Sequence, residues 1–362
     1  MPNVVGPFKS GSSSIPPIQA HLAHLRHLST PDAAQRLLRD RFGMPAREAR
    51  TEGRLVSSHI EQALAFHAHS TAASPRIRPL LQYYCYLNLA VALILSYRPA
   101  NYQQYRRHGV EDQSHRLRSL ELSSILVKVR KGAVPVFHSI LSAEPIVGRH
   151  FRLNELAGSI PLVKYELSTL FGMHCQTIRA TDLVAHDALG NWWSQLSFEC
   201  MDEGGQPANL SKNRLERAVP ELRQFFTIID QKRDRLDYRS TNSWPTQEAA
   251  QTWHCQNSFK AINYGGHRIY VGPPFQFNLM NQYQWHCLVG KPLLPTLTAT
   301  LLLAFALASI ARYRPSIARG VEEISLSVLL DTFIAEADSI VIPSMRNLLY
   351  REEFCIQLLD AI

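Results

Sequence analysis

The chain has 362 residues, of which 46% are hydrophobic and 19% are charged, a balance typical of a soluble globular protein. This composition supplies enough apolar material for a large core and excludes a small fold that depends on disulfides or metals for stability. The formal net charge is +8, and most of the excess is arginine, whose guanidinium group binds phosphate in a bidentate fork. The charge therefore favours either a polyanionic partner or a surface of ordinary ion pairs.

The cysteines and the N-terminus both indicate a cytoplasmic protein. No two cysteines form a CxxC pair, and most lie in apolar stretches, where a free thiol behaves as a small hydrophobic group. We therefore expect a reducing compartment without a disulfide framework. Residues 1–14 lack the basic and apolar regions of a secretory signal, and we expect them to be a flexible leader.

Residues 15–115 are predicted to form a helical part. Helix signals recur through it: prolines at first turns, apolar residues at helical spacing and a glycine stop at Gly43. The segments expected to be helical are 16–28, 29–42, 46–70 and 77–97. Pro99 helps to end the last of them, because proline disfavours helical geometry in the residue before it.

Residues 116–275 are predicted to form a β-rich middle part, since the apolar period changes there from helical spacing to alternation. We expect one hairpin over 115–141 with its turn at Lys131-Gly132, and a second over 176–201 with its turn at Leu189-Gly190-Asn191. Two short helices are expected between the hairpins, and more strands after them at 226–243 and 259–274.

Residues 276–362 are predicted to return to helix and to pack on residues 15–115. The apolar run from Pro292 to Ala311 is nearly long enough to span a bilayer, but its threonines and Pro295 favour a buried core helix. Two more helical patterns follow, at 321–340 and 342–362. Helices on both sides of a β-rich middle give an α+β fold, and we expect no membrane association.

The usual signatures of several enzyme classes are missing from the sequence. It contains no GxxxxGK[ST] loop, no GxGxxG that opens a helix, no GxSxG elbow and no HExxH. Two groups of histidines, at 21–27 and 59–69, lack acidic or cysteine residues at ligand spacing. We therefore expect no metal site and no cofactor, and whether the protein is an enzyme stays open.

A metal-independent ribonuclease needs few residues: a histidine that moves the proton of the 2′-hydroxyl, and an arginine or lysine that holds the phosphate. Arg54 and His59 have a suitable spacing on one predicted helix, and His108 directly follows Arg107. These four residues are the candidate catalytic groups. The alternative is that they are ordinary surface residues.

A second candidate surface combines arginine with tyrosine, the composition that stacks on bases and binds phosphates. Two apolar helices end in Tyr-Arg-Pro, as "SYRP" and "RYRP". If these helices pack side by side, their ends would lie near each other. The candidate nucleic-acid-binding residues are Arg98, Tyr102, Tyr105, Arg106, Arg312 and Arg314.

Several blocks of the sequence occur in the order and spacing of a known family. They are "SPRIRPLLQYYCYLNLAVALIL" followed by "HGV", then "LELSSILVKVRKGAVPVFHSIL", "FRLNELAGSIPLV" and "LLLAFALASIARYRPS". Together they resemble the YaaC-like proteins of bacteria from about residue 55 onwards. The resemblance implies a cytosolic bacterial protein of mixed α+β type and transfers no catalytic residue. The aromatic helix before His108 also resembles the core helix of HEPN ribonucleases, although no arginine stands four to six residues before that histidine.

Three functions follow as hypotheses. The first, which we favour, is a binding or accessory protein that engages RNA, DNA or an acidic protein partner through its arginine and tyrosine residues. The second is a HEPN-like, metal-independent ribonuclease acting in host defence. The third is a structural or assembly subunit of a complex, because no specific catalytic motif is present.

Overall fold

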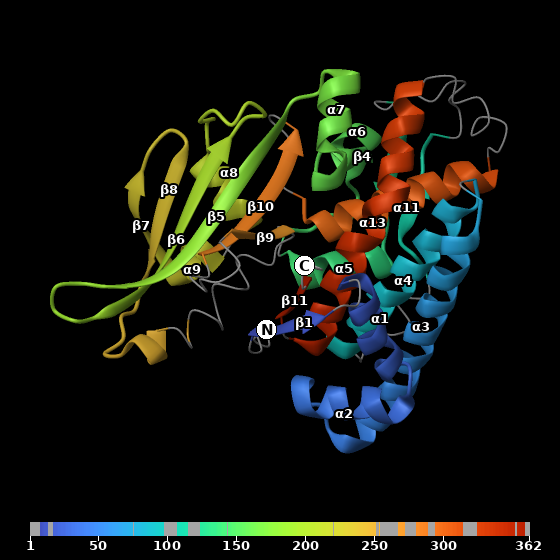
Figure 1. The fold of residues 1–362 in the computed structure, drawn as a ribbon, viewed down its shortest axis with the longest axis horizontal. Coiled ribbons are helices and arrows are strands. Elements are labelled where there is room, and N and C mark those ends of the chain that lie inside the picture. The colour runs from blue at the N-terminus through green and yellow to red at the C-terminus, as the bar shows by residue number, and fades with distance from the viewer. Residues whose placement is uncertain are drawn as a thin grey trace.

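The protein consists of a helical body and a separate antiparallel sheet, which lie side by side in Figure 1. The computed structural model describes residues 8–13, 17–74, 76–97, 107–114, 124–142, 144–219, 221–250, 253, 267–271, 280–288, 294–313, 324–351 and 353–358. The predicted α+β class is confirmed, with helices towards both ends of the chain and strands between them.

Four helices open the helical body, and all four were predicted. They are α1 (Pro17–Leu28), α2 (Pro31–Phe42), α3 (Ala46–Ala72) and α4 (Arg78–Tyr97). Proline at the start of α2 occupies a position where its missing N–H is not needed. Gly43 ends α2 in the left-handed conformation, with φ of 63°, and its N–H donates to the Arg39 carbonyl.

Helix α4 and helix α11 (Thr296–Tyr313) form the centre of the helical body. Both are apolar enough and long enough to cross a membrane, but 72% and 78% of their apolar windows are buried inside the protein. Helix α4 packs against α3, α5 and α11, and every residue of α11 from Thr296 to Ile310 is buried. The two helices are therefore placed as the core helices of a soluble domain are.

A small sheet lies beside this core, in the order β2 (Val110–Asp112), β3 (Leu126–Val129) and β4 (His150–Arg152). The predicted hairpin turn at Lys131-Gly132 is wrong, because the chain continues from Gly132 into helix α5 (Ala133–Leu141). Pro135 lies in the first turn of this helix, where proline is tolerated. Helix α5 packs against α4 and α11, so tertiary burial decides its structure.

Helix α6 (Leu153–Ala157), a 3-10 turn (Pro161–Val163) and α7 (Lys164–Phe171) complete the body next to the large sheet. Two short helices were predicted here, and Gly172 ends α7 with φ of 59°. Buried residues of these elements belong to the same hydrophobic cluster as α4 and α11. Residues 125–171 fall in the expected β-rich part, 116–275, but their buried apolar side chains pack in the helical core.

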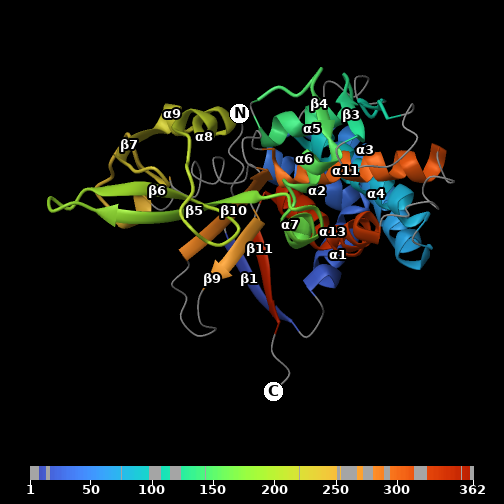
Figure 2. The same ribbon diagram turned by 90° about the horizontal axis from the view of Figure 1, so that it is seen from above.

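The large sheet has six antiparallel strands in the order β7-β8-β6-β5-β10-β9. Their bounds are β5 (Cys175–His186), β6 (Trp192–Met201), β7 (Phe226–Gln231), β8 (Arg235–Ser240), β9 (His267–Val271) and β10 (Met280–Leu288). The hairpin of β5 and β6 was predicted, and its turn contains Gly190 with φ of 81°. Figure 2 shows helices α8 (Lys212–Ala218) and α9 (Glu221–Phe225) on one face of this sheet, where a second hydrophobic cluster forms.

The last described elements differ most from the sequence-based expectation. One helix, α13 (Ile324–Tyr350), replaces the two that were predicted, and it accommodates Pro343 in its interior. Strand β11 (Glu353–Leu358) follows it and pairs in parallel with β1 (Phe8–Ser13). Strand β1 lies inside the segment that we expected to be a flexible leader.

Candidate nucleic-acid interface

The segment that carries Arg107 and His108 is held against the start of α5. The carbonyl groups of these two residues accept hydrogen bonds of 2.9 Å from the N–H groups of Ala133 and Val134. Gly109 and Gly132 meet at this contact, and a Cβ atom on Gly132 would lie 2.5 Å from the Arg107 carbonyl oxygen. The absence of both side chains therefore lets the two backbone segments touch and sets the position of His108.

The His108 ring joins two aromatic rings from the core helices. Its centroid lies 6.2 Å from that of Tyr83 on α4 and 6.1 Å from that of Phe305 on α11. The Tyr83 and Phe305 rings lie 5.4 Å apart in an edge-to-face arrangement. An exposed histidine is therefore positioned by buried rings from two helices.

The row of rings continues along α4 to α3 and ends beside Arg312. The Tyr84 ring lies 5.5 Å from that of Tyr83 and stacks on Phe66 at a centroid distance of 5.3 Å. The Arg312 guanidinium donates to the Tyr84 hydroxyl at 3.4 Å and also lies 5.1 Å from the ring centroid of Tyr313. We call Phe66, Tyr83, Tyr84, His108, Phe305 and Arg312 the ring cluster.

The electrostatics of the ring cluster favour a neutral histidine beside a fixed positive charge. Burial, and then the charge of Arg312, lower the pKa of His108 below its ordinary value. His108 is therefore uncharged at neutral pH, whereas Arg312 is charged and exposed. Among the described residues, no carboxylate forms an ion pair with Arg312.

Tyr83 contributes a polar atom that the fold leaves unused. Only 3% of Tyr83 is exposed, and its buried hydroxyl has no hydrogen-bond partner among the described residues. Burial raises the pKa of this hydroxyl further above its ordinary value, so the group is protonated and can donate. A buried hydroxyl without a partner costs about 1–3 kcal/mol, which a bound water or ligand atom would recover.

Of the candidate binding residues, only Arg312 lies in the described part of the chain. Arg98, Tyr102, Tyr105, Arg106 and Arg314 lie outside the described residues.

The other candidate catalytic pair takes two different positions on α3. The His59 Nδ1 atom lies 2.8 Å from the Asn88 side-chain oxygen on α4, whereas Arg54 is exposed. Five residues along a helix correspond to a rotation of about 140°. His59 therefore faces α4, whereas Arg54 faces solvent.

The described ends of the two Tyr-Arg-Pro helices lie at opposite ends of α4. Arg312 contacts Tyr84 near the start of α4, and the helix runs about 20 Å further before it reaches Tyr97. Tyr97 packs instead on Phe42, at the end of α2, and donates to the Leu348 carbonyl. Side-by-side packing of the two helices would have brought these ends together, but the described contacts bring the end of α11 to the start of α4.

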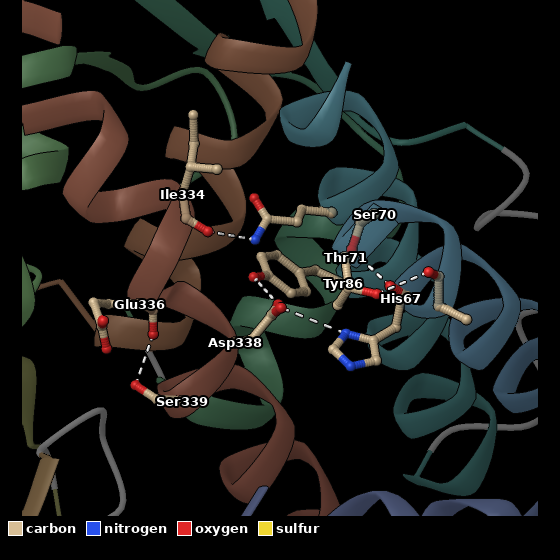
Figure 3. A network of polar contacts seen from close by, with 10 residues as sticks. His67, Ser70, Thr71, Tyr86, Ile334, Glu336, Asp338 and Ser339 are labelled. Atoms are coloured by element: carbon tan, nitrogen blue, oxygen red, sulfur yellow. Dashed lines mark hydrogen bonds and ion pairs between the residues drawn. The ribbon is translucent and has the colours of Figure 1, made fainter. Parts of the chain in front are cut away.

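A second polar network lies deeper, between α3, α4 and α13 (Figure 3). The Tyr86 hydroxyl donates to one carboxylate oxygen of Asp338 at 2.5 Å, and the His67 Nδ1 atom lies 3.4 Å from the other. The nearby Gln82 amide donates to the Ile334 carbonyl at 2.7 Å. Because Asp338 is buried and contacts side chains of α3 and α4, this network ties three helices together.

The comparison with protein families identifies the chain. The YaaC-like protein family matches residues 26–334, which include all of α2 to α11 and part of α13. This chain belongs to the YaaC-like family. No curated protein matches it.

In this YaaC-like chain the aromatic residues of the ring cluster were not predicted as site residues. Tyr83 and Tyr84 occur in "QYYCY", which we interpreted as part of a core helix, and Phe305 occurs in the most apolar helix. Four aromatic or cysteine side chains in a row were the only available signal. No group of histidine, cysteine, aspartate or glutamate residues suited to a metal occurs in the described part of the chain.

Proposed function

We propose that this protein binds nucleic acid in the bacterial cytoplasm through the ring cluster. One observation carries the proposal: His108 and Arg312, which are far apart in sequence and both exposed, lie beside one continuous row of aromatic rings. Arginine beside aromatic rings is the combination that proteins use for phosphates and stacked bases. The net charge of +8 supports the same type of partner.

The predicted mark of this function is salt-sensitive binding that depends on Arg312. Each phosphate contact releases counterions, so affinity for a short RNA or DNA strand should fall steeply as salt rises. Arg312→Ala should weaken binding about tenfold at low salt and should flatten the dependence on salt. Fluorescence anisotropy at several salt concentrations measures both effects.

Arg36→Ala is the matched control, because Arg36 is also exposed and its loss changes the net charge equally. Equal losses for the two variants would mean that overall charge, and not the ring cluster, attracts the strand. An affinity that does not change between low and moderate salt would exclude phosphate contacts.

A second candidate function is metal-independent RNA cleavage, with a role in host defence. It is favoured by the lowered pKa of His108, because a neutral imidazole can accept the 2′-hydroxyl proton. Arg107, which precedes His108, and Arg312, which contacts the Tyr84 hydroxyl, are both exposed and supply the positive charge that this mechanism needs at the phosphate. The cleavage hypothesis therefore uses the binding surface proposed above and adds one chemical step.

If the protein cleaves RNA, activity should persist in EDTA and should fall at least a hundredfold in His108→Ala. Activity should also decrease as the pH drops below the pKa of His108, because the protonated ring cannot act as a base. Gel analysis of a labelled RNA gives the rate. His59→Ala is the control for the α3 histidine, and cleavage that survives both substitutions would reject the mechanism.

A further inference from the structure

An apolar groove of about 990 Å³ opens along the second half of α3 and the start of α4. Its lining includes Ala65, Phe66, Ala68, His69, Ala72 and Leu81, together with Gln62, and no carboxylate occurs among the described residues that line it. The volume is that of a site for a small molecule or for part of a larger ligand.

The groove is continuous with the ring cluster through Phe66. This residue lines the groove and also stacks on Tyr84, whose hydroxyl accepts the hydrogen bond from Arg312. The apolar groove therefore lies next to the positive charge of Arg312. A ligand that covers both must have a flat apolar part and an anionic part.

Two polar groups at the groove can bind the edge of a base. The Nδ1 atom of His69 donates to the Ala65 carbonyl at 2.7 Å, so Nε2 is the ring nitrogen left to bind a ligand and is an acceptor in the neutral ring. Gln62 is exposed and provides both a donor and an acceptor. Such groups recognise the amino and carbonyl groups of nucleobases.

We propose that the groove holds an unpaired nucleobase of a single strand whose phosphate is bound by Arg312. This inference rests on the proposed nucleic-acid binding and names its ligand as single-stranded, because bases in a duplex are stacked and cannot enter a groove. Small side chains at Ala65 and Ala68 give the base room, and Phe66 offers a ring against which it stacks.

The test compares a single strand with the same strand lacking bases. Affinities are measured by fluorescence anisotropy for a single-stranded RNA, the DNA of equal sequence, its duplex and an abasic DNA strand. The double variant Ala65→Leu/Ala68→Leu fills the groove at exposed helical positions where leucine is well tolerated. Ala46→Leu, an exposed position at the other end of α3, is the control.

We expect the groove-filling variant to lose at least tenfold in affinity for the strands with bases and nothing for the abasic strand. The control should bind as the unmodified protein does, and the duplex should bind more weakly than the single strand. Comparison of RNA with DNA shows whether the sugar contributes.

Equal affinity for the abasic and base-bearing strands would overturn the inference, and so would a filled groove that binds normally. In either case a persistent effect of Arg312→Ala would leave the proposed function standing. A change of oligomeric state in the filled variant, measured by sedimentation, would assign the groove to contacts between copies and reject base binding. Absence of binding by every strand at low salt would reject both proposals.

Discussion

Alanine in place of Gly132 should destabilise the protein by about 3 kcal/mol or more and displace His108. The added Cβ would lie 2.5 Å from both the Arg107 carbonyl oxygen and the Gly109 nitrogen. These are backbone atoms, so they cannot rotate away as a flexible side chain would. The hydrogen bonds from the first turn of α5 to the carbonyls of Arg107 and His108 would be broken or stretched.

Gly148→Ala is the matched control for this substitution. Gly148 has a positive φ of 85°, but a Cβ there meets nothing within 4 Å. It should therefore lose only about 1–2 kcal/mol of backbone energy. Urea unfolding measures both variants, and binding of a single strand measures the effect on His108. Similar losses in the two variants would show that the two backbone segments do not touch as described.

Acidification below about pH 6.5 should destabilise the protein through two buried histidines. Burial lowers the pKa of His138 to about 4, and it also lowers the pKa of His21 to about 4, with a contribution from Arg346. In an unfolded chain histidine has a pKa of about 6.5. Between these two values the unfolded state binds more protons, so the free energy of unfolding falls as the pH falls.

The expected loss for His138 is on the order of 3 kcal/mol by about pH 4, because one pKa unit corresponds to about 1.4 kcal/mol. The His138 Nε2–H donates to the Glu144 carbonyl at 2.8 Å, and the Thr298 hydroxyl lies 3.1 Å from Nδ1. A protonated ring would lose the acceptor that faces Thr298. His138→Gln keeps a donor and an acceptor but cannot titrate.

Urea unfolding at neutral and acid pH, compared between variants, separates this histidine from the carboxylates that titrate in the same range. His138→Gln should be less stable than the unmodified protein at neutral pH but should lose less stability on acidification. His150→Gln replaces an exposed histidine on β4 and should change neither value. An unchanged acid response in His138→Gln would mean that this ring is not a source of the acid sensitivity.

Helices with clear end signals could be predicted from the sequence, and elements that depend on distant partners could not. Pro31 and Gly43 mark both ends of α2 locally, and the turn at Gly190 joins β5 to β6 directly. Helix α5 has an alternating pattern that suggested a strand, but its burial against α4 and α11 favours helix. The pairing of β1 with β11 joins segments from the two ends of the described chain, and no local pattern indicates it.

The candidate site could also be predicted only in part, because some of its features are local and others depend on distant partners. His108 and Arg312 could be chosen as candidates from their residue types and neighbours, but their proximity depends on how α11 packs against α4. The aromatic rings between them were interpreted as core, and Tyr83 and Phe305 are indeed buried. Sequence patterns predict whether a residue is buried or exposed. They do not predict this site, because it forms where a row of buried rings meets exposed residues at the surface.

The register between β5 and β10 brings together the points at which the chain enters and leaves the large sheet. Leu288, the last residue of β10, pairs with Cys175, the first residue of β5. Paired residues on antiparallel strands lie about 5 Å apart. The six-stranded sheet therefore leaves and rejoins the helical body at neighbouring positions, and we expect insertions within it to leave the path of the chain through the helical core unaltered.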